Sequence, residues 1–158
     1  EMIWRLEFRR VLFRSEDADV KKVAAASYDP FEYLMLRHKE GKLRQDFKNP
    51  LGKIAYHVAC HLRVQNIGLK TREVLELIPQ TQVEAIERCS GHNGTYAVKS
   101  EFHEASMKIG RPVVSRVERA DAQHYSSDCP MAGHQIENGL KKGAPEHPLT
   151  LLRKAYGI

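Results

Sequence analysis

The sequence predicts an α/β protein in which a parallel sheet is covered by crossover helices. Short apolar segments alternate along the chain with longer amphipathic ones, a pattern that favours parallel strands joined by right-handed crossovers. The 158 residues, 42% of them hydrophobic and 28% charged, fit a single globular domain. In such a sheet the loops that follow the carboxyl ends of the strands form the binding crevice.

The first 15 residues are kept apart from the fold prediction. Residues 6–15 resemble the translation of a sequencing-adaptor oligonucleotide, so we expect residues 1–15 not to be native. Residues 16–158 are then expected to form one domain, a fragment of a larger protein. Four arginines and two glutamates in residues 1–15 supply +2 of the formal net charge of +5, which leaves +3 for the remainder.

A charge of this size indicates no nucleic-acid partner, because the arginines are not clustered and aromatic residues are not interleaved with them. The sequence holds no run of about 18 apolar residues, the length that a membrane span needs. We therefore expect a cytoplasmic protein with no membrane span in this fragment.

A helix start is encoded at residues 29–32. Asp29 supplies a capping oxygen, Pro30 suits the first helical position, and Glu32 completes a capping box. Helical spacing then places four residues on one packing face, and Gly41 is the expected stop. These four residues are Phe31, Leu34, Met35 and His38.

Two strands and a helix are expected next, and each strand is followed by a cysteine. Residues 53–59 form a short apolar run that leads to Cys60, and residues 83–87 form a second run that leads to Cys89. Between them, residues 71–78 have a helical pattern that Pro79 ends.

The second half of the chain is predicted to be mainly helical. Residues 100–120 have a helical pattern that Gly110 and Pro112 interrupt, which predicts a kink or two shorter helices. Residues 124–127 are expected to form a third strand. Asp128 is then expected to cap a helix over residues 129–140, and a last helix follows in which Leu149, Leu152 and Tyr156 share a face. The expected inward residues of the helix over residues 129–140 are Ala132, Ile136 and Leu140.

The three cysteines are predicted to converge at one edge of the sheet. Cys60, Cys89 and Cys129 are separated by 28 and 39 residues, and each follows a predicted strand. An odd number of cysteines argues against a closed disulfide framework. Spacing therefore predicts a metal or thiol site, with inert burial as the alternative.

The order of short motifs around these cysteines resembles a known family. Residues 56–61 read Tyr-His-x-x-Cys-His, residues 89–96 read Cys-Ser-Gly-x-x-Gly-Thr-Tyr, and residues 128–132 read Asp-Cys-x-x-Ala. This order resembles the cysteine-rich CCG-domain family, which includes the B subunit of heterodisulfide reductase and the C subunit of anaerobic glycerol-3-phosphate dehydrogenase. The resemblance covers roughly residues 27–156 and implies the second CCG domain of an iron–sulfur electron carrier.

Two positions depart from the family pattern. Ser90 stands at the second cysteine of the Cys-Cys-Gly pair, and Ala132 stands at the last cysteine of the closing Cys-x-x-Cys. By resemblance, Cys60, Cys89 and Cys129 remain as ligands of a cluster, expected to be of the 4Fe-4S type, in an electron-transfer module of an oxidoreductase. The expected partner is a redox protein or a flavoprotein subunit of a larger complex, which associates peripherally with the inner face of the membrane.

Three thiolates need a fourth ligand to complete a 4Fe-4S cluster or a tetrahedral zinc site. His92 and His134 are the candidates, whereas His61 is expected to orient the loop beside Cys60. Gly91 and Gly94 are expected to let backbone amides approach cluster sulfurs. Two alternatives remain open at this point: a structural Cys3His zinc domain, and a degenerate CCG domain that serves as a docking module. A self-contained enzyme is not expected.

Overall fold

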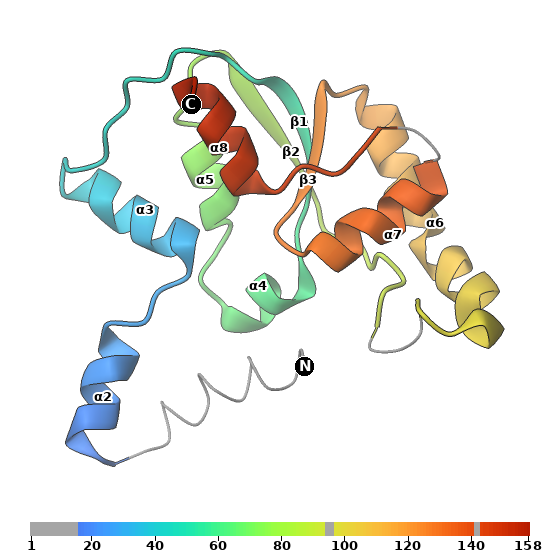
Figure 1. Cartoon of the computed structure of the whole chain (residues 1–158), viewed down its shortest axis with the longest axis horizontal. Coiled ribbons are helices and arrows are strands. Elements are labelled where there is room, and N and C mark those ends of the chain that lie inside the picture. The colour runs from blue at the N-terminus through green and yellow to red at the C-terminus, as the bar shows by residue number, and fades with distance from the viewer. Residues whose placement is uncertain (1–15, 94–96, 141–142) are drawn as a thin grey trace.

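The computed structural model describes residues 16–93, 97–140 and 143–158 (Figure 1). Parallel strands alternate with helices along the chain, as the sequence predicts. The elements in chain order are α2 (Ala18–Ala25), α3 (Pro30–Lys39), β1 (Gly52–His57), α4 (Cys60–Gln65), α5 (Lys70–Leu75), β2 (Thr81–Ile86), the 3-10 turn η1 (Ser100–Phe102), α6 (His103–Ala120), β3 (His124–Ser127), α7 (Pro130–Leu140) and α8 (Pro148–Tyr156).

The described strands form one parallel sheet in the order β2-β1-β3, with β1 in the centre. At their carboxyl ends the register pairs His57 of β1 with Ile86 of β2 on one side and with Ser127 of β3 on the other. All three strands therefore end in the same row. The prediction of a mixed α/β fold with a parallel sheet is confirmed.

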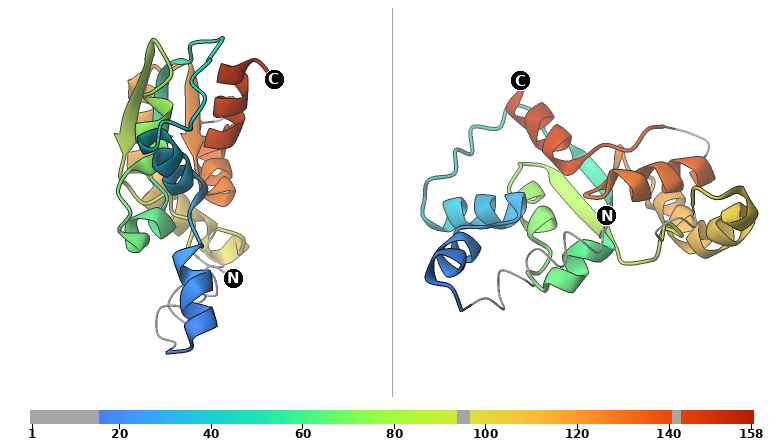
Figure 2. Two further views of the ribbon diagram at one scale, coloured as in Figure 1. Left: turned by 90° about the vertical axis from the view of Figure 1, so that its left-hand side faces the viewer. Right: turned by 60° about the horizontal axis from the view of Figure 1, so that its bottom comes forward.

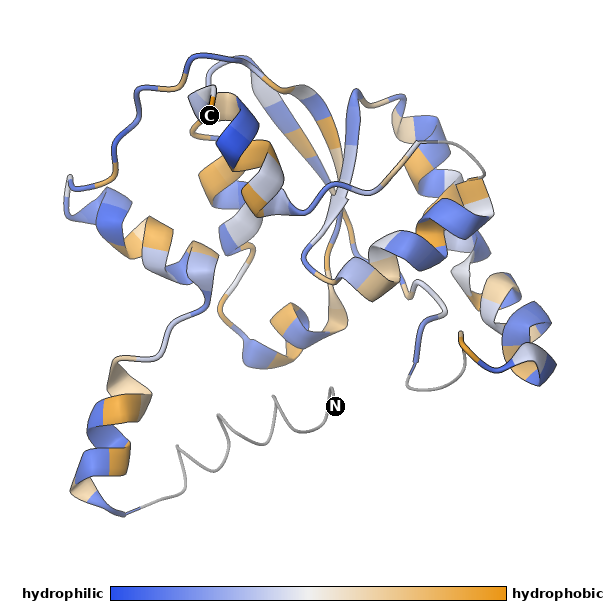
Figure 3. Ribbon diagram, in the orientation of Figure 1, coloured by the Kyte–Doolittle hydropathy of each residue, from blue (hydrophilic) through white to orange (hydrophobic). Residues whose placement is uncertain are grey.

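Helices cover both faces of the sheet, which explains why its central strand is apolar on both sides. One core joins α3, α5 and α8 to a sheet face that includes Ile54 and Tyr56. The other joins α6 and α7 to the opposite face, which includes Ala55. Figure 2 shows the sheet between these helical layers, and Figure 3 shows polar and apolar bands alternating along the helices.

The helices that follow β1 and β3 pack on opposite faces of the sheet. After β1 the chain forms α4 and then α5, which packs in the first core, whereas after β3 it forms α7, which packs in the second. A point at which neighbouring strands lead to opposite faces is where ligands bind in open parallel sheets. Cys60 and Cys129 lie on the two sides of this point.

The helix start at Asp29 is confirmed in atomic detail. The Asp29 carboxylate accepts hydrogen bonds from the backbone N–H groups of Phe31 and Glu32, and the Glu32 side chain accepts one from the Asp29 N–H. Gly41 follows with a φ of 66°, in the left-handed region that ends many helices. Local sequence is sufficient here because every partner lies within three residues.

Residues 103–120 form one helix that includes Pro112, which excludes the two shorter helices that the sequence allowed as an alternative to a kink. One further element prediction was wrong, and the buried face of α8 differs from the one that the sequence indicates. Asp128 does not cap α7, which begins at Pro130, because its carboxylate bonds with residues of β1 and α5. In α8 the buried residues are Pro148, Leu151, Leu152 and Ala155, whereas Leu149 is exposed. Helices α2 and α4 were not predicted.

Pro112 is tolerated within α6 because the buried residues of the helix lie on both sides of it. Gly110 and Val113, which flank the proline, are buried, whereas Pro112 itself is exposed. Packing of this face outweighs the loss of one backbone hydrogen bond. Among the described residues, no helix combines the length and apolarity needed to span a membrane.

Candidate functional site

The loops that follow β1, β2 and β3 each carry one cysteine at the same edge of the sheet. Cys60 is the first residue of α4, Cys89 lies in the loop after β2, and Cys129 immediately precedes α7. Cys60 and Cys89 are exposed, Cys129 is half-buried, and all three are free thiols. The topology therefore brings the three loops to one edge, as the spacing predicts.

The side chains at this edge do not form a metal-binding group. Across residues 16–93, 97–140 and 143–158, no three His, Cys, Asp or Glu side chains are grouped so that they could hold a metal ion. Three thiols suit an iron–sulfur cluster in donor chemistry. Strand order brings the backbones of the three loops to one edge, but the described side chains there are not grouped in a common coordination sphere.

Two cavities among the described residues lie away from the cysteines. One of about 580 Å³ lies where the strands begin and is lined by residues that include Gly52, Thr81 and Gln123. Another of about 350 Å³ lies beside α6 and β3 and is lined by residues that include Val117 and Tyr125. None of the three cysteines lines either cavity, and Cys60 and Cys89 lie on the surface.

The segment that carries Cys89, here called the Cys89 loop (residues 87–93), crosses closely over α6. Gly91 has a φ of 81°, and a Cβ placed on it would lie 2.1 Å from the carbonyl oxygen of Ser106. A Cβ on Gly110 of α6 would lie 2.6 Å from the carbonyl oxygen of Ser90. Both glycines therefore permit backbone contact between the loop and the helix.

This contact gives Gly91 a packing role that the sequence did not predict. The Gly91 N–H points toward Cys89, whose Sγ lies 3.4 Å from that nitrogen and accepts a hydrogen bond from it. Gly94, the other glycine predicted to approach a cluster, lies outside the described residues.

A buried polar pair holds the Cys89 loop from the side of α6 and α7. The Ser106 hydroxyl of α6 donates to the Gly91 carbonyl oxygen at 2.9 Å and accepts from Gln135 Nε2 of α7 at 2.7 Å. Ser106 is fully buried and Gln135 nearly so. These residues satisfy one another, so the polar groups incur little of the usual penalty of burial.

His57 joins the Cys89 loop to the turn before Cys129. Its Nε2 lies 2.9 Å from the Arg88 carbonyl oxygen, and its Nδ1 lies 3.0 Å from Ser127 Oγ. Ser127 Oγ in turn accepts a hydrogen bond from the Cys129 N–H at 3.2 Å. Burial lowers the pKa of His57 below 6.5, as does the nearby Arg63, and the Arg88 carbonyl offsets part of this effect.

The Asp128 carboxylate anchors the residue next to Cys129. One oxygen accepts from the Tyr56 hydroxyl, and the other accepts from the Thr71 hydroxyl at 2.9 Å. Burial raises the pKa of Asp128, whereas the two hydroxyl donors lower it. Burial likewise raises the pKa of Tyr56, and so does the neighbouring carboxylate. Asp128 thereby ties the start of α7 to β1 and α5.

The histidines predicted near the cysteines have three different environments. His92 is half-buried, and its Nδ1 is a buried atom without a hydrogen-bond partner among the described residues. His134 has an exposed side chain on α7 and bonds with Glu137 at 2.9 Å. His61 is half-buried beside Cys60 in α4. Of the two histidines predicted as fourth ligands, His92 and not His134 has a buried ring nitrogen without a hydrogen-bond partner among the described residues.

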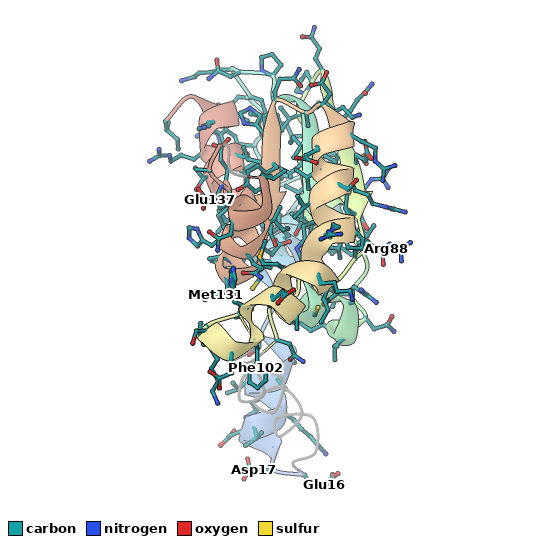
Figure 4. All side chains as sticks on the ribbon, turned by 90° about the vertical axis from the view of Figure 1, so that its right-hand side faces the viewer. Glu16, Asp17, Arg88, Phe102, Met131 and Glu137 are labelled. Carbon is teal, nitrogen blue, oxygen red and sulfur yellow. The ribbon has the colours of Figure 1, made fainter. Side chains whose placement is uncertain are left out.

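Sequence reasoning missed the residues that position the cysteine loops. His57, Ser127, Ser106 and Gln135 are all buried, and each bonds with a residue at least 15 positions away, apart from the short contact between Ser127 and Cys129. A histidine within an otherwise apolar strand is one signal that could have indicated a buried hydrogen-bonded group. In the view of Figure 4, Arg88 of the Cys89 loop lies on one side of α6 and Met131 lies on the other.

Comparison with known proteins shows similarity to one component of a dehydrogenase. Over 124 residues, 78% of this chain, the sequence is 34% identical to the C subunit of anaerobic glycerol-3-phosphate dehydrogenase from Escherichia coli strain K12. The values for the protein of the same name from Escherichia coli O157:H7 are the same. The matched region spans 31% of the length of these relatives.

No family model matches the chain. No solved structure matches it either. The similarity in sequence is therefore what places the chain among known proteins. It is sufficient to state that the chain is related to the C subunit of anaerobic glycerol-3-phosphate dehydrogenase.

Proposed function

We propose that this chain is an electron-transfer module of an oxidoreductase, and that Cys60, Cys89 and Cys129 are the ligands of its iron–sulfur centre. One observation carries the proposal: in a relative of a dehydrogenase component, three parallel strands end in one row and each is followed by a free cysteine. An iron–sulfur centre would supply one-electron redox chemistry when bound. The partner would be a redox protein or a flavoprotein subunit of the same complex.

His92 is the residue that we assign as the fourth ligand. Its Nδ1 is buried and has no hydrogen-bond partner among the described residues, a state that costs free energy unless the nitrogen gains one. It follows Cys89 by three residues in the same loop. We expect cluster binding to require movement of the side chains at this edge, because among the described residues they are not grouped as metal ligands.

The test is anaerobic reconstitution of the full chain with iron and sulfide, followed by elemental analysis, absorbance and EPR. We expect iron and sulfide to be bound in cluster stoichiometry, with a reducible EPR signal. The variants Cys60→Ser, Cys89→Ser and Cys129→Ser should each lose iron. His103→Ala is the matched control, because His103 is exposed on α6 and was not predicted as a ligand.

A docking module without metal is the second candidate function. It is favoured by the absence, within the described residues, of grouped metal-ligating side chains. In that case no iron would be retained, and the three cysteine variants would be as stable as the wild type under every metal condition. One zinc ion without iron would instead indicate the structural Cys3His site.

A further inference from the structure

We propose that His57 is a positioning residue that holds the Cys89 loop and the turn before Cys129 at a fixed separation. The inference rests on the proposed function only in that it treats Cys89 and Cys129 as functional residues. It concerns the relative position of two loops that follow different strands. Neither the spacing of the cysteines nor the sheet register alone fixes that position.

A continuous path of hydrogen bonds leads from one loop to the other. The Arg88 carbonyl oxygen can only accept, so Nε2 of His57 carries the hydrogen and donates across 2.9 Å. Nδ1 is then the acceptor, and the Ser127 hydroxyl donates to it across 3.0 Å. The Cys129 N–H donates to the same hydroxyl oxygen across 3.2 Å. The donor and acceptor roles along this path are mutually consistent, with the Ser127 hydroxyl donating one hydrogen bond and accepting another.

The centre of the path, the hydrogen bond between His57 and Ser127, is shielded from water, whereas the bonds at its two ends are partly buried. His57 is 1% exposed and Ser127 is 3% exposed. In a dry environment a broken hydrogen bond is not replaced by one to solvent, so the bond between His57 and Ser127 restrains both side chains strongly. His57 also lies on the central strand, between the two strands whose loops it joins. Among the described strands, only the central strand β1 lies next to both β2 and β3.

The Cys89 loop is held at a second carbonyl as well. His57 fixes the carbonyl of Arg88, one residue before Cys89, and Ser106 fixes the carbonyl of Gly91, two residues after it. The Cys89 side chain itself is exposed. Because the backbone is held on both sides of Cys89, the exposed thiol is kept in a constant position.

The test measures the separation of the two thiols directly in metal-free protein. Nitroxide labels on Cys89 and Cys129, in a Cys60→Ser background, report the distance distribution by double electron–electron resonance. We expect a single narrow distribution. His57→Phe, which keeps an aromatic ring but removes both bonds, should broaden it, and Ser127→Ala should do the same.

Ser126→Ala is the matched control, because Ser126 is also a buried serine of β3 but bonds with the Glu146 carbonyl. This variant should leave the distribution unchanged. A second measurement is the alkylation rate of Cys129 by iodoacetamide, which should rise about fivefold in Ser127→Ala, as expected for the loss of one hydrogen bond.

An unchanged distribution in folded Ser127→Ala and His57→Phe would overturn the proposal, even if both variants were less stable. Should His57→Phe fail to fold, Ser127→Ala alone decides the question. Because no metal is present in these measurements, their result is independent of whether the protein binds an iron–sulfur centre. Failure of reconstitution and failure of this inference are therefore distinguishable.

Discussion

His57 is buried in its neutral form, and this has a consequence for stability at low pH. Its folded-state pKa lies below 6.5, mainly because burial disfavours the charged imidazolium. As the pH falls below 6.5, the unfolded chain binds a proton at this site before the folded protein does. The free energy of unfolding is therefore at its full value above pH 6.5 and decreases below it.

We predict that His57→Phe makes the protein less sensitive to acid. Urea unfolding at about pH 7 and about pH 5 should show a smaller loss of stability in the variant than in the wild type, because the variant has no imidazole at this site to protonate. The wild-type protein should still be the more stable of the two at the higher pH. His103→Ala, at an exposed histidine, should retain the wild-type acid sensitivity. An equal loss of stability in the wild type and His57→Phe would contradict the prediction.

At the scale of the secondary-structure elements, two glycines allow the Cys89 loop to pack closely against α6. It brings backbone atoms together at two points, Gly91 against Ser106 and Gly110 against Ser90. The loop following β2 is thereby attached to the helix that leads to β3. Helix packing thus decides the position of Cys89, which neighbouring residues in the sequence do not determine.

Gly91→Ala should destabilise the protein by more than about 2 kcal/mol, because the new Cβ would meet a backbone carbonyl that cannot move alone. Gly41→Ala is the control, since Gly41 also has positive φ but has open space around it. It should cost only about 1 kcal/mol. Gly110→Ala tests the contact without the effect of φ. Urea unfolding midpoints measure all three, and equal losses in Gly91→Ala and Gly41→Ala would exclude a packing role for the contact.

Across the molecule as a whole, one sheet is shared by two cores. β1 contributes Ile54 and Tyr56 to one core and Ala55 to the other. A cavity in either core therefore weakens the same central strand. We expect the two faces to unfold together as one cooperative unit.

Leu75→Ala in α5 and Ile136→Ala in α7 should each lower the free energy of unfolding by about 2–5 kcal/mol. These residues are fully buried on opposite faces of the sheet. Thermal unfolding followed by circular dichroism should show a single transition in both variants. Ile109→Ala, at a residue 47% exposed on α6, is the control and should have little effect. Two separate transitions in either core variant would show that the faces unfold independently.

Local sequence was enough to predict the alternation of strands and helices, the helix start at Asp29 and the placement of a cysteine after each strand. These features depend on residues that are neighbours in the chain or that repeat at a fixed period. The same local reasoning was wrong at Asp128, whose carboxylate bonds with Tyr56 and Thr71 instead of capping a helix.

The surroundings of the three cysteines, in contrast, became known only from the folded chain. His57, Ser127, Ser106 and Gln135 support the cysteine loops, and within the described part of the chain the sulfur atoms share no coordination sphere. The physical reason is that these contacts join residues far apart in the chain. Their geometry depends on how α6 and α7 pack on the sheet, which no period in the sequence encodes.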